Sequence, residues 1–215
     1  MRKNLLIPLV MVVLAAVAVL FAANAGDDDG STSATAGDGR AERLVRPDSQ
    51  RLEDPAASEA TFVEFLDFEC EACGAAYPAI EQLREQYGDR VTFVVRYMPL
   101  HNNSEAAIRA AEAAADQGKF EEMYDRLFET QAAWGEKDTS QEEVFFGFAE
   151  DLGLDMDRFR QVYGDPATIE KVRRDKADGE ALGVTGTPTF FVDGEKLEIR
   201  SFDDLVKALD DALAG

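Results

Sequence analysis

Apolar positions divide the chain into three regions of different pattern. An almost unbroken apolar run extends from Leu5 to Ala23. Residues 26–41 are rich in Asp, Gly, Ser, Thr and Ala and contain almost no large apolar side chain. From residue 42 to 215, apolar positions recur at the spacing of strands and helices. The pattern predicts a hydrophobic N-terminal segment (1–25), a flexible acidic linker (26–41) and one domain with a full core (42–215).

The hydrophobic segment predicts that the rest of the chain is exported. Residues 5–23 would rise about 28 Å as a helix, close to the hydrocarbon thickness of a bilayer. The sequence Ala23-Asn24-Ala25 also fits a signal-peptidase site. We expect an uncleaved anchor in the cell membrane, because the run is longer than most signal-peptide cores, with cleavage after Ala25 as the alternative. Under either interpretation the domain is extracytoplasmic, because the basic end stays inside.

The first half of the domain predicts a strand, a helix and a second strand. Residues 62–66 form an apolar run bounded by polar residues, and a helical pattern continues to about Tyr87. Residues 91–97 predict the second strand. Strand, helix and strand in about 35 residues form a βαβ unit with parallel strands. Residues 44 and 45 predict a further short edge strand, which Pro47 ends.

The second half predicts a long helical region, then a hairpin and a last helix. Helical spacing of apolar residues extends from about residue 104 to 183. The expected helix starts are Ser104, a capping box of Ser140 with Glu143, Asp155, Asp165 before Pro166, and Ser201 with Asp204. Residues 189–192 and 195–199 predict a hairpin around a two-residue Asp-Gly turn.

The charge of the chain limits its partners. The formal net charge is −21, and the part beyond residue 25 carries −23, because only Arg2 and Lys3 lie before it. A surface this acidic repels nucleic acid and anionic membranes. We interpret the charge as a means of solubility, with an acidic docking surface as the alternative.

Cys70 and Cys73 are the only cysteines, and they stand where the first predicted strand gives way to a helix. Free N–H groups and the helix dipole favour the thiolate of the first cysteine. The second lies one turn on, where it can attack a mixed disulfide. A disulfide closing so short a loop is a poor structural staple. The number of ligands also argues against a zinc site, because zinc needs three or four and His101 is the only histidine beside the two cysteines.

The residues around this pair resemble the thioredoxin superfamily, and more closely its DsbA-like thiol–disulfide oxidoreductases. The resemblance rests on Glu64-Phe65 six residues before Cys70, on Asp67-Phe68, and on the distant Thr187-Pro188. It covers roughly residues 42–215. It implies an α/β, thioredoxin-like fold with an inserted helical subdomain at about residues 104–183.

The resemblance also implies roles for three further residues. In the family, a buried acid at the offset of Glu64 accepts the proton of the second cysteine, here Cys73; the alternative is an edge or solvent-facing Glu. The proline at the place of Pro188 is cis, and with the residue before it, here Thr187, forms the wall of a peptide groove. An ordinary loop proline is the alternative. Two residues remain open: His101, near the site or in a loop, and Trp134, in the core or near the site.

The implied reaction is the formation of disulfides in extracytoplasmic proteins. A substrate thiolate attacks the Cys70–Cys73 disulfide, and a second substrate thiol resolves the mixed disulfide at Cys70. No bound organic cofactor is needed. A membrane quinone-linked oxidase of the DsbB or vitamin-K-epoxide-reductase type would reoxidise the pair, and we expect a monomer. The alternatives are a reductase or isomerase of the same fold, or an anchored peptide-binding module whose disulfide is inert.

One departure from the family concerns the residues around Cys70. Glu71-Ala72 stands between the cysteines, where DsbA-like proteins often have proline and then histidine or an aromatic residue. Glu69 and Glu71 flank Cys70 with negative charge, which is expected to raise the pKa of its thiol. We therefore expect a milder oxidant than the strongest family members, with a potential below about −120 mV.

Overall fold

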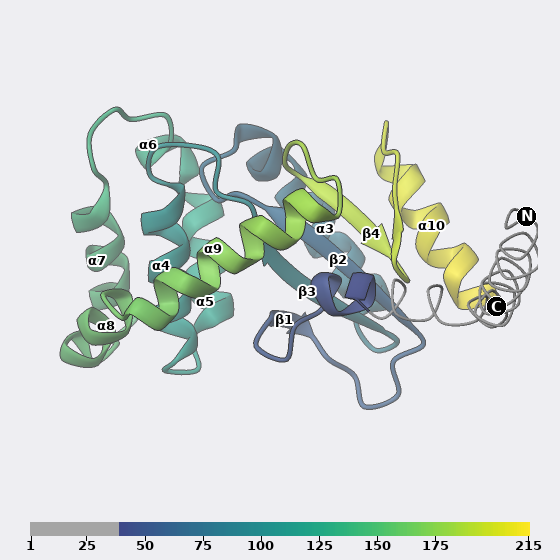
Figure 1. The fold of residues 1–215 in the computed structure, drawn as a ribbon, viewed down its shortest axis with the longest axis horizontal. Coiled ribbons are helices and arrows are strands. Elements are labelled where there is room, and N and C mark those ends of the chain that lie inside the picture. Colours follow the sequence, from purple (N-terminus) through teal and green to yellow (C-terminus); the bar gives the residue numbers. More distant parts are fainter. Residues whose placement is uncertain (1–38) are drawn as a thin grey trace, which may run out of the picture. The chain divides into compact units, whose positions relative to one another are not determined.

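The computed structural model describes residues 39–215 (Figure 1). The predicted anchor or signal peptide, and the predicted linker up to residue 38, lie outside the described residues. Within residues 39–215, no helix combines the length and the apolar character that crossing a membrane requires.

A five-stranded mixed sheet forms the centre of the domain, in the order β1–β3–β2–β4–β5. β2 (Ala60–Leu66) and β3 (Val91–Tyr97) pair in parallel, and the helix α3 (Glu71–Tyr87) connects them. β1 (Gln50–Glu53), β4 (Thr189–Val192) and β5 (Glu195–Lys196) pair antiparallel with their neighbours. The predicted βαβ unit is confirmed. β2 and β3 are nearly continuous apolar runs because both faces of the sheet are covered there.

The helical region lies between β3 and β4. It consists of α4 (Ser104–Ala115), α5 (Phe120–Glu129), α6 (Gln131–Trp134), α7 (Glu142–Asp151), α8 (Met156–Tyr163) and α9 (Pro166–Ala181). In Figure 1, α4 to α8 gather on one side of the sheet, and α9 runs back from them toward it. The last helix, α10 (Phe202–Ala214), packs against β2 and β4. The expected thioredoxin-like fold with an inserted helical subdomain is confirmed.

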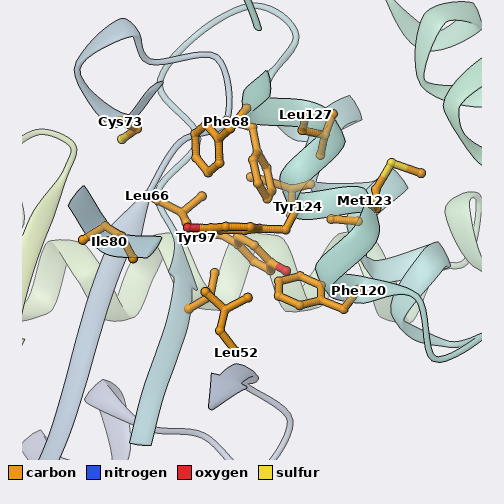
Figure 2. Close-up of a cluster of buried hydrophobic side chains, with 14 of the residues drawn as sticks. Leu52, Leu66, Phe68, Cys73, Ile80, Tyr97, Phe120, Met123, Tyr124 and Leu127 are labelled. Carbon is orange, nitrogen blue, oxygen red and sulfur yellow. The ribbon is translucent and has the colours of Figure 1, made fainter. Parts of the chain in front are cut away.

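An aromatic cluster joins the inserted helices to the sheet (Figure 2). Phe68, in the loop after β2, packs against Tyr97 of β3 and against Tyr124 and Phe128 of α5. The ring centroids of these pairs lie 5.1 to 6.3 Å apart. Figure 2 shows Cys73 at the edge of this cluster, close to Phe68. The loop that carries the cysteines is therefore seated on the core.

Trp134 belongs to the core of the inserted helices. Its side chain is fully buried and meets Phe145 of α7 edge-on, with the ring centroids 4.9 Å apart. Its Nε1 donates a hydrogen bond to the carbonyl oxygen of Leu127 (3.1 Å). Because both the ring and its polar atom have partners inside the subdomain, the position of Trp134 is explained by packing.

Three of the predicted helix starts are confirmed. The carboxylate of Asp155 accepts hydrogen bonds from backbone N–H groups in the first turn of α8. Asp165 does the same for α9, with Pro166 in the first turn. The carboxylate of Asp204 accepts from the backbone N–H of Ser201 (2.9 Å) at the start of α10.

Four predictions of local structure were wrong. Residues 44 and 45 do not form the predicted edge strand. Residues 39–44 are helical, and β1 forms that edge of the sheet. Ser104 lies inside α4 and donates to a buried carboxylate, so it does not cap the helix. α7 begins at Glu142 without a side-chain cap, so Ser140 and Glu143 form no capping box. The second strand of the hairpin ends at Lys196, well before residue 199.

A buried ionic cluster lies beside a second, smaller apolar cluster. The guanidinium of Arg96 on β3 is fully buried and pairs with Asp175 and Asp178 of α9, each at 2.9 Å. Asp178 also pairs with Arg46 (2.8 Å) and Arg43 (3.1 Å). These ion pairs hold α9 and the first described segment against β3. Apolar patterns could not predict this contact, because it joins charged residues far apart in the chain.

Candidate functional site

The two cysteines differ in their exposure at the start of α3. Cys70 stands at the N-cap of the helix and is 9% exposed, whereas Cys73, in the first turn, is 1% exposed. Both are free thiols in the structure. The backbone N–H of Cys70 donates to the carbonyl oxygen of Asp67 (3.1 Å), which closes the loop between β2 and α3. An incoming molecule can therefore reach the first sulfur more readily than the second.

The surroundings separate the acidities of the two thiols. A hydrogen bond from the Cys73 side chain, outweighing the effect of burial, lowers the pKa of Cys70 to about 5; the backbone N–H groups of Cys73 and Ala72 add to it. Burial raises the pKa of Cys73 far above its ordinary value, and the hydrogen bond to Cys70 and the charge of Glu64 add to this. At neutral pH the reduced pair therefore holds a thiolate at Cys70 and a thiol at Cys73.

The acidic flanks were expected to raise the pKa of the Cys70 thiol, but its net pKa is lowered, in the direction that the helix start predicts. The carboxylate of Glu69 is 2% exposed and accepts hydrogen bonds from the backbone N–H (2.5 Å) and the Nδ2 (3.3 Å) of Asn103. Glu71 is exposed, so water screens its charge. The largest effects on the pKa of Cys70 are the hydrogen bonds made to its sulfur, which lower it, and its burial, which raises it.

Glu64 lies at the centre of the sheet, and its side chain is buried. It pairs with Val95 of β3 on one side and with Phe190 of β4 on the other. Glu64 is 3% exposed, which excludes the alternative of an edge or solvent-facing residue. Burial raises the pKa of its carboxyl to about 8, and the negative charges of Glu81 and Cys70 act in the same direction. The Glu64 carboxyl is therefore largely protonated at neutral pH, and it can donate or accept a proton inside the protein.

Thr187 and Pro188 approach the cysteine pair from the start of β4. The bond between them is cis. The carbonyl oxygen of Thr187 lies 3.3 Å from the Sγ of Cys70. A groove of about 640 Å³ begins there, between α3, β4, the segment after β5 and α10. Its lining includes Ala72, Ala76, Pro188, Phe190, Lys196, Leu197, Ile199, Arg200, Phe202 and Leu205.

A second, smaller recess borders the first cysteine on the side of the inserted helices. It has a volume of about 450 Å³. Glu69, Glu71, Gln131, Glu136 and Lys137 contribute its polar lining. Within residues 39–215, no group of three or more His, Cys, Asp or Glu side chains is arranged to hold a metal ion.

Known proteins with related sequences and folds fall into two groups. The chain is 40% identical over 153 residues to the Na(+)/H(+) antiporter NhaA of Herminiimonas arsenicoxydans, a match that covers 71% of this chain and 24% of that protein. A solved thioredoxin-like oxidoreductase from Silicibacter pomeroyi DSS-3 has 27% identity and a TM-score of 0.69, covering 81% of this chain and 98% of that one. α-DsbA1 of Wolbachia pipientis has 20% identity and a TM-score of 0.71, with 82% and 96% covered.

A family model described as Thioredoxin matches residues 47–211. The chain belongs to the thioredoxin family. This thioredoxin-family chain has the fold of the DsbA-like thiol–disulfide oxidoreductases among the solved structures. It spans about a quarter of the length of the curated relatives it matches, so the antiporter name describes those longer proteins.

Two site residues of this thioredoxin-family chain could not be assigned from sequence. Asp67 is fully buried and its Oδ2 accepts from the backbone N–H of Leu100 and the hydroxyl of Ser104, each at 2.8 Å. The same oxygen lies 2.7 Å from the Nδ1 of His101, in the loop entering α4. His101 therefore lies in the loop that enters α4, and its ring contacts Asp67, whose carbonyl oxygen accepts from the N–H of Cys70. The only feature of the sequence that singled out His101 was that the chain has no other histidine.

Gln131 is a third residue that sequence reasoning missed. Its Nε2 donates to the carbonyl oxygens of Phe68 (2.7 Å) and Cys70 (2.9 Å). Its amide also lies so close to Gly74 that a Cβ there would be 2.1 Å from Oε1. The inserted helices therefore contact the cysteine loop directly through hydrogen bonds from Gln131, and no local sequence pattern predicts this contact.

Proposed function

We propose that this chain is an exported protein disulfide oxidoreductase that forms disulfides in extracytoplasmic proteins through Cys70 and Cys73. The observation that carries the proposal is the position of the pair at the start of α3, with Cys70 at the N-cap and Cys73 buried in the first turn, where the pKa of the first thiol is lowered and that of the second is raised. A stabilised thiolate favours the reduced pair, and a pair that prefers to be reduced oxidises others.

The proposed reaction transfers two electrons from a substrate dithiol to the pair. A substrate thiolate attacks Sγ of Cys70, the Cys70–Cys73 bond breaks, and Cys73 leaves as a thiolate. Glu64, protonated at neutral pH, supplies the proton that Cys73 takes up. A second substrate thiolate then attacks the substrate sulfur of the mixed disulfide. Cys70 leaves as its stabilised thiolate, and the substrate keeps the new disulfide.

The groove beside Pro188 supports binding of an extended polypeptide. It starts at Ala72, between the cysteines, and its lining combines apolar side chains with the charged residues Lys196, Glu198 and Arg200. We propose that Thr187 and Pro188 form its wall and that unfolded extracytoplasmic protein thiols are the substrates. Reoxidation requires an external acceptor, for which we propose a membrane quinone-linked oxidase of the DsbB or vitamin-K-epoxide-reductase type. The domain is held outside the cytoplasm by residues 5–23, or released by cleavage after Ala25.

A trapping experiment tests this proposal. Cys73→Ala has no Cys70–Cys73 disulfide, so its Cys70 thiolate forms a mixed disulfide by attacking a disulfide of an exported protein, and the variant lacks the thiol that would release this adduct from within the site. We expect disulfide-linked adducts of Cys73→Ala with exported proteins, visible on non-reducing gels, and none with Cys70→Ser as the matched control. A Cys70→Ser variant that still restores a strain lacking the protein would instead favour an inert peptide-binding module.

The reduction potential decides the direction of electron flow. We would measure it for the Cys70–Cys73 pair against glutathione. A value near −150 mV is expected for a disulfide donor, whereas a value of −250 mV or lower would favour the reductase alternative.

A further inference from the structure

The loop before α4 is fixed to the cysteine loop through one buried carboxylate. The Oδ1 of Asp67 accepts a hydrogen bond from the backbone N–H of Glu69 (3.0 Å). Its Oδ2 accepts from the N–H of Leu100 and the hydroxyl of Ser104 and contacts the Nδ1 of His101. The main-chain oxygen of the same residue accepts from the N–H of Cys70. One fully buried residue thus connects the imidazole of His101 to the backbone of the first cysteine.

The imidazole is held by one nitrogen and leaves the other available. Nδ1 faces Asp67, and the side chain of His101 is 43% exposed. Burial lowers the pKa of this imidazole, but the hydrogen bond and charge of Asp67 and the charges of Cys70 and Glu69 outweigh it, so the net pKa is raised. A protonated imidazole therefore persists toward neutral pH on Asp67, whose carbonyl oxygen accepts from the N–H of the first cysteine.

From this geometry we infer that His101, oriented by Asp67, is a functional residue that stabilises the thiolate of Cys70. The imidazolium is the cation that Asp67 holds at the cysteine loop, and its charge favours the anionic form of the sulfur. The inference rests on the proposed redox role of Cys70. It adds a residue 31 positions away from the cysteine, from a loop outside the motif.

Other charges around His101 are acidic or engaged elsewhere. Asp67 and Glu69 come from the loop before α3, and each accepts hydrogen bonds from its own partners. On the side of the inserted helices, Glu136 and Lys137 are exposed and lie in the loop whose backbone contacts Asn103. None of these groups changes its covalent state when the cysteines are oxidised. A response of His101 to oxidation therefore reports on Cys70.

The single histidine makes a direct test possible. NMR titration of the one imidazole gives the pKa of His101 in the reduced and the oxidised protein. We expect its proton affinity to be about three- to tenfold higher in the reduced protein, because only that form has the thiolate. Linkage requires that removing the imidazolium weakens the acidity of Cys70 by the same factor. Absorbance of the thiolate near 240 nm measures that factor.

His101→Asn is the matched variant, because its amide can keep a hydrogen bond to Asp67 while losing the charge. We expect it to slow alkylation of Cys70 by iodoacetamide at pH 5 by about two- to fivefold, because about half of the thiol is already ionised at that pH, with the unfolding midpoint unchanged. Leu100→Ala, at the exposed neighbouring position, serves as the control and should leave the titration unchanged.

Equal imidazole pKa values in the two redox states would overturn the inference, as would a Cys70 titration unchanged in His101→Asn. These outcomes are separable from failure of the proposed function. Both measurements need only a chemically reduced and a chemically oxidised pair, whatever the substrates are.

Discussion

At the scale of single residues, Glu64 links the chemistry of the site to stability. The folded protein keeps the proton of Glu64 up to a pH of about 8, whereas the unfolded chain releases it near 4.5. Over this interval the folded state loses about 1.4 kcal/mol of stability for each pH unit. The loss begins at the unfolded-state pKa and ends once the pH has passed the folded-state pKa.

Glu64→Gln is therefore expected to raise the free energy of unfolding at pH 8, by about 2–4 kcal/mol, and to flatten its slope between pH 5 and 8. It should also slow the step in which Cys73 exchanges a proton. Urea unfolding of the oxidised protein at several pH values measures the first effect. The oxidised form is chosen because a free Cys70, with its low pKa, gains stability as the pH rises and masks the slope.

Glu85→Gln, on the exposed face of α3, is the control and should change stability by less than about 0.5 kcal/mol. If both variants had the same pH slope as the unmodified protein, the buried acid would not be the cause.

At the scale of elements, α6 holds the start of α3 in place. Gln131 donates to two carbonyl oxygens of the cysteine loop, and Gly74 leaves room for its amide. Gly74→Ala must displace that amide, and Gln131→Ala removes it, so each should cost about 1–2 kcal/mol in urea unfolding. Because both changes break the same contacts, the double variant should cost clearly less than the sum.

The matched control for this pair is Gly147→Ala in α7. A Cβ at Gly147 meets nothing within 4 Å, so alanine should be neutral or stabilising there. Additive costs for Gly74→Ala and Gln131→Ala would show that the amide does not couple the two elements.

At the scale of the whole domain, the ionic cluster at Asp178 ties the first described segment to the sheet. Removing this carboxylate leaves Arg46 and the buried Arg96 short of a partner. Asp178→Asn is expected to cost about 3–5 kcal/mol of unfolding free energy. Arg43→Ala, which removes a half-exposed partner of the same carboxylate, should cost less than about 1 kcal/mol. Comparable losses in the two variants would contradict this ranking.

The sequence predicted those features that depend on neighbouring residues. Apolar runs predicted β2, α3 and β3, and the spacing of Cys70 and Cys73 predicted a redox pair at a helix start. Gln131 and His101 escaped prediction because their contacts cross 61 and 34 residues and use single polar atoms. The lowered pKa of Cys70 follows the expectation from the helix start, whereas the effect expected from the acidic flanks does not prevail. Counting nearby acids in sequence ignores that Glu69 is turned toward Asn103.

The different burial of the two sulfurs also affects the lifetime of the mixed disulfide at Cys70. In the proposed reaction, Cys73 is the thiol of the pair that can release a substrate from Cys70 prematurely, and it must first lose a proton that burial makes it hold tightly. A slow internal escape gives the substrate's own second cysteine time to arrive from a distant part of an unfolded chain. The burial of Cys73 thus slows premature release and favours completion of the substrate disulfide.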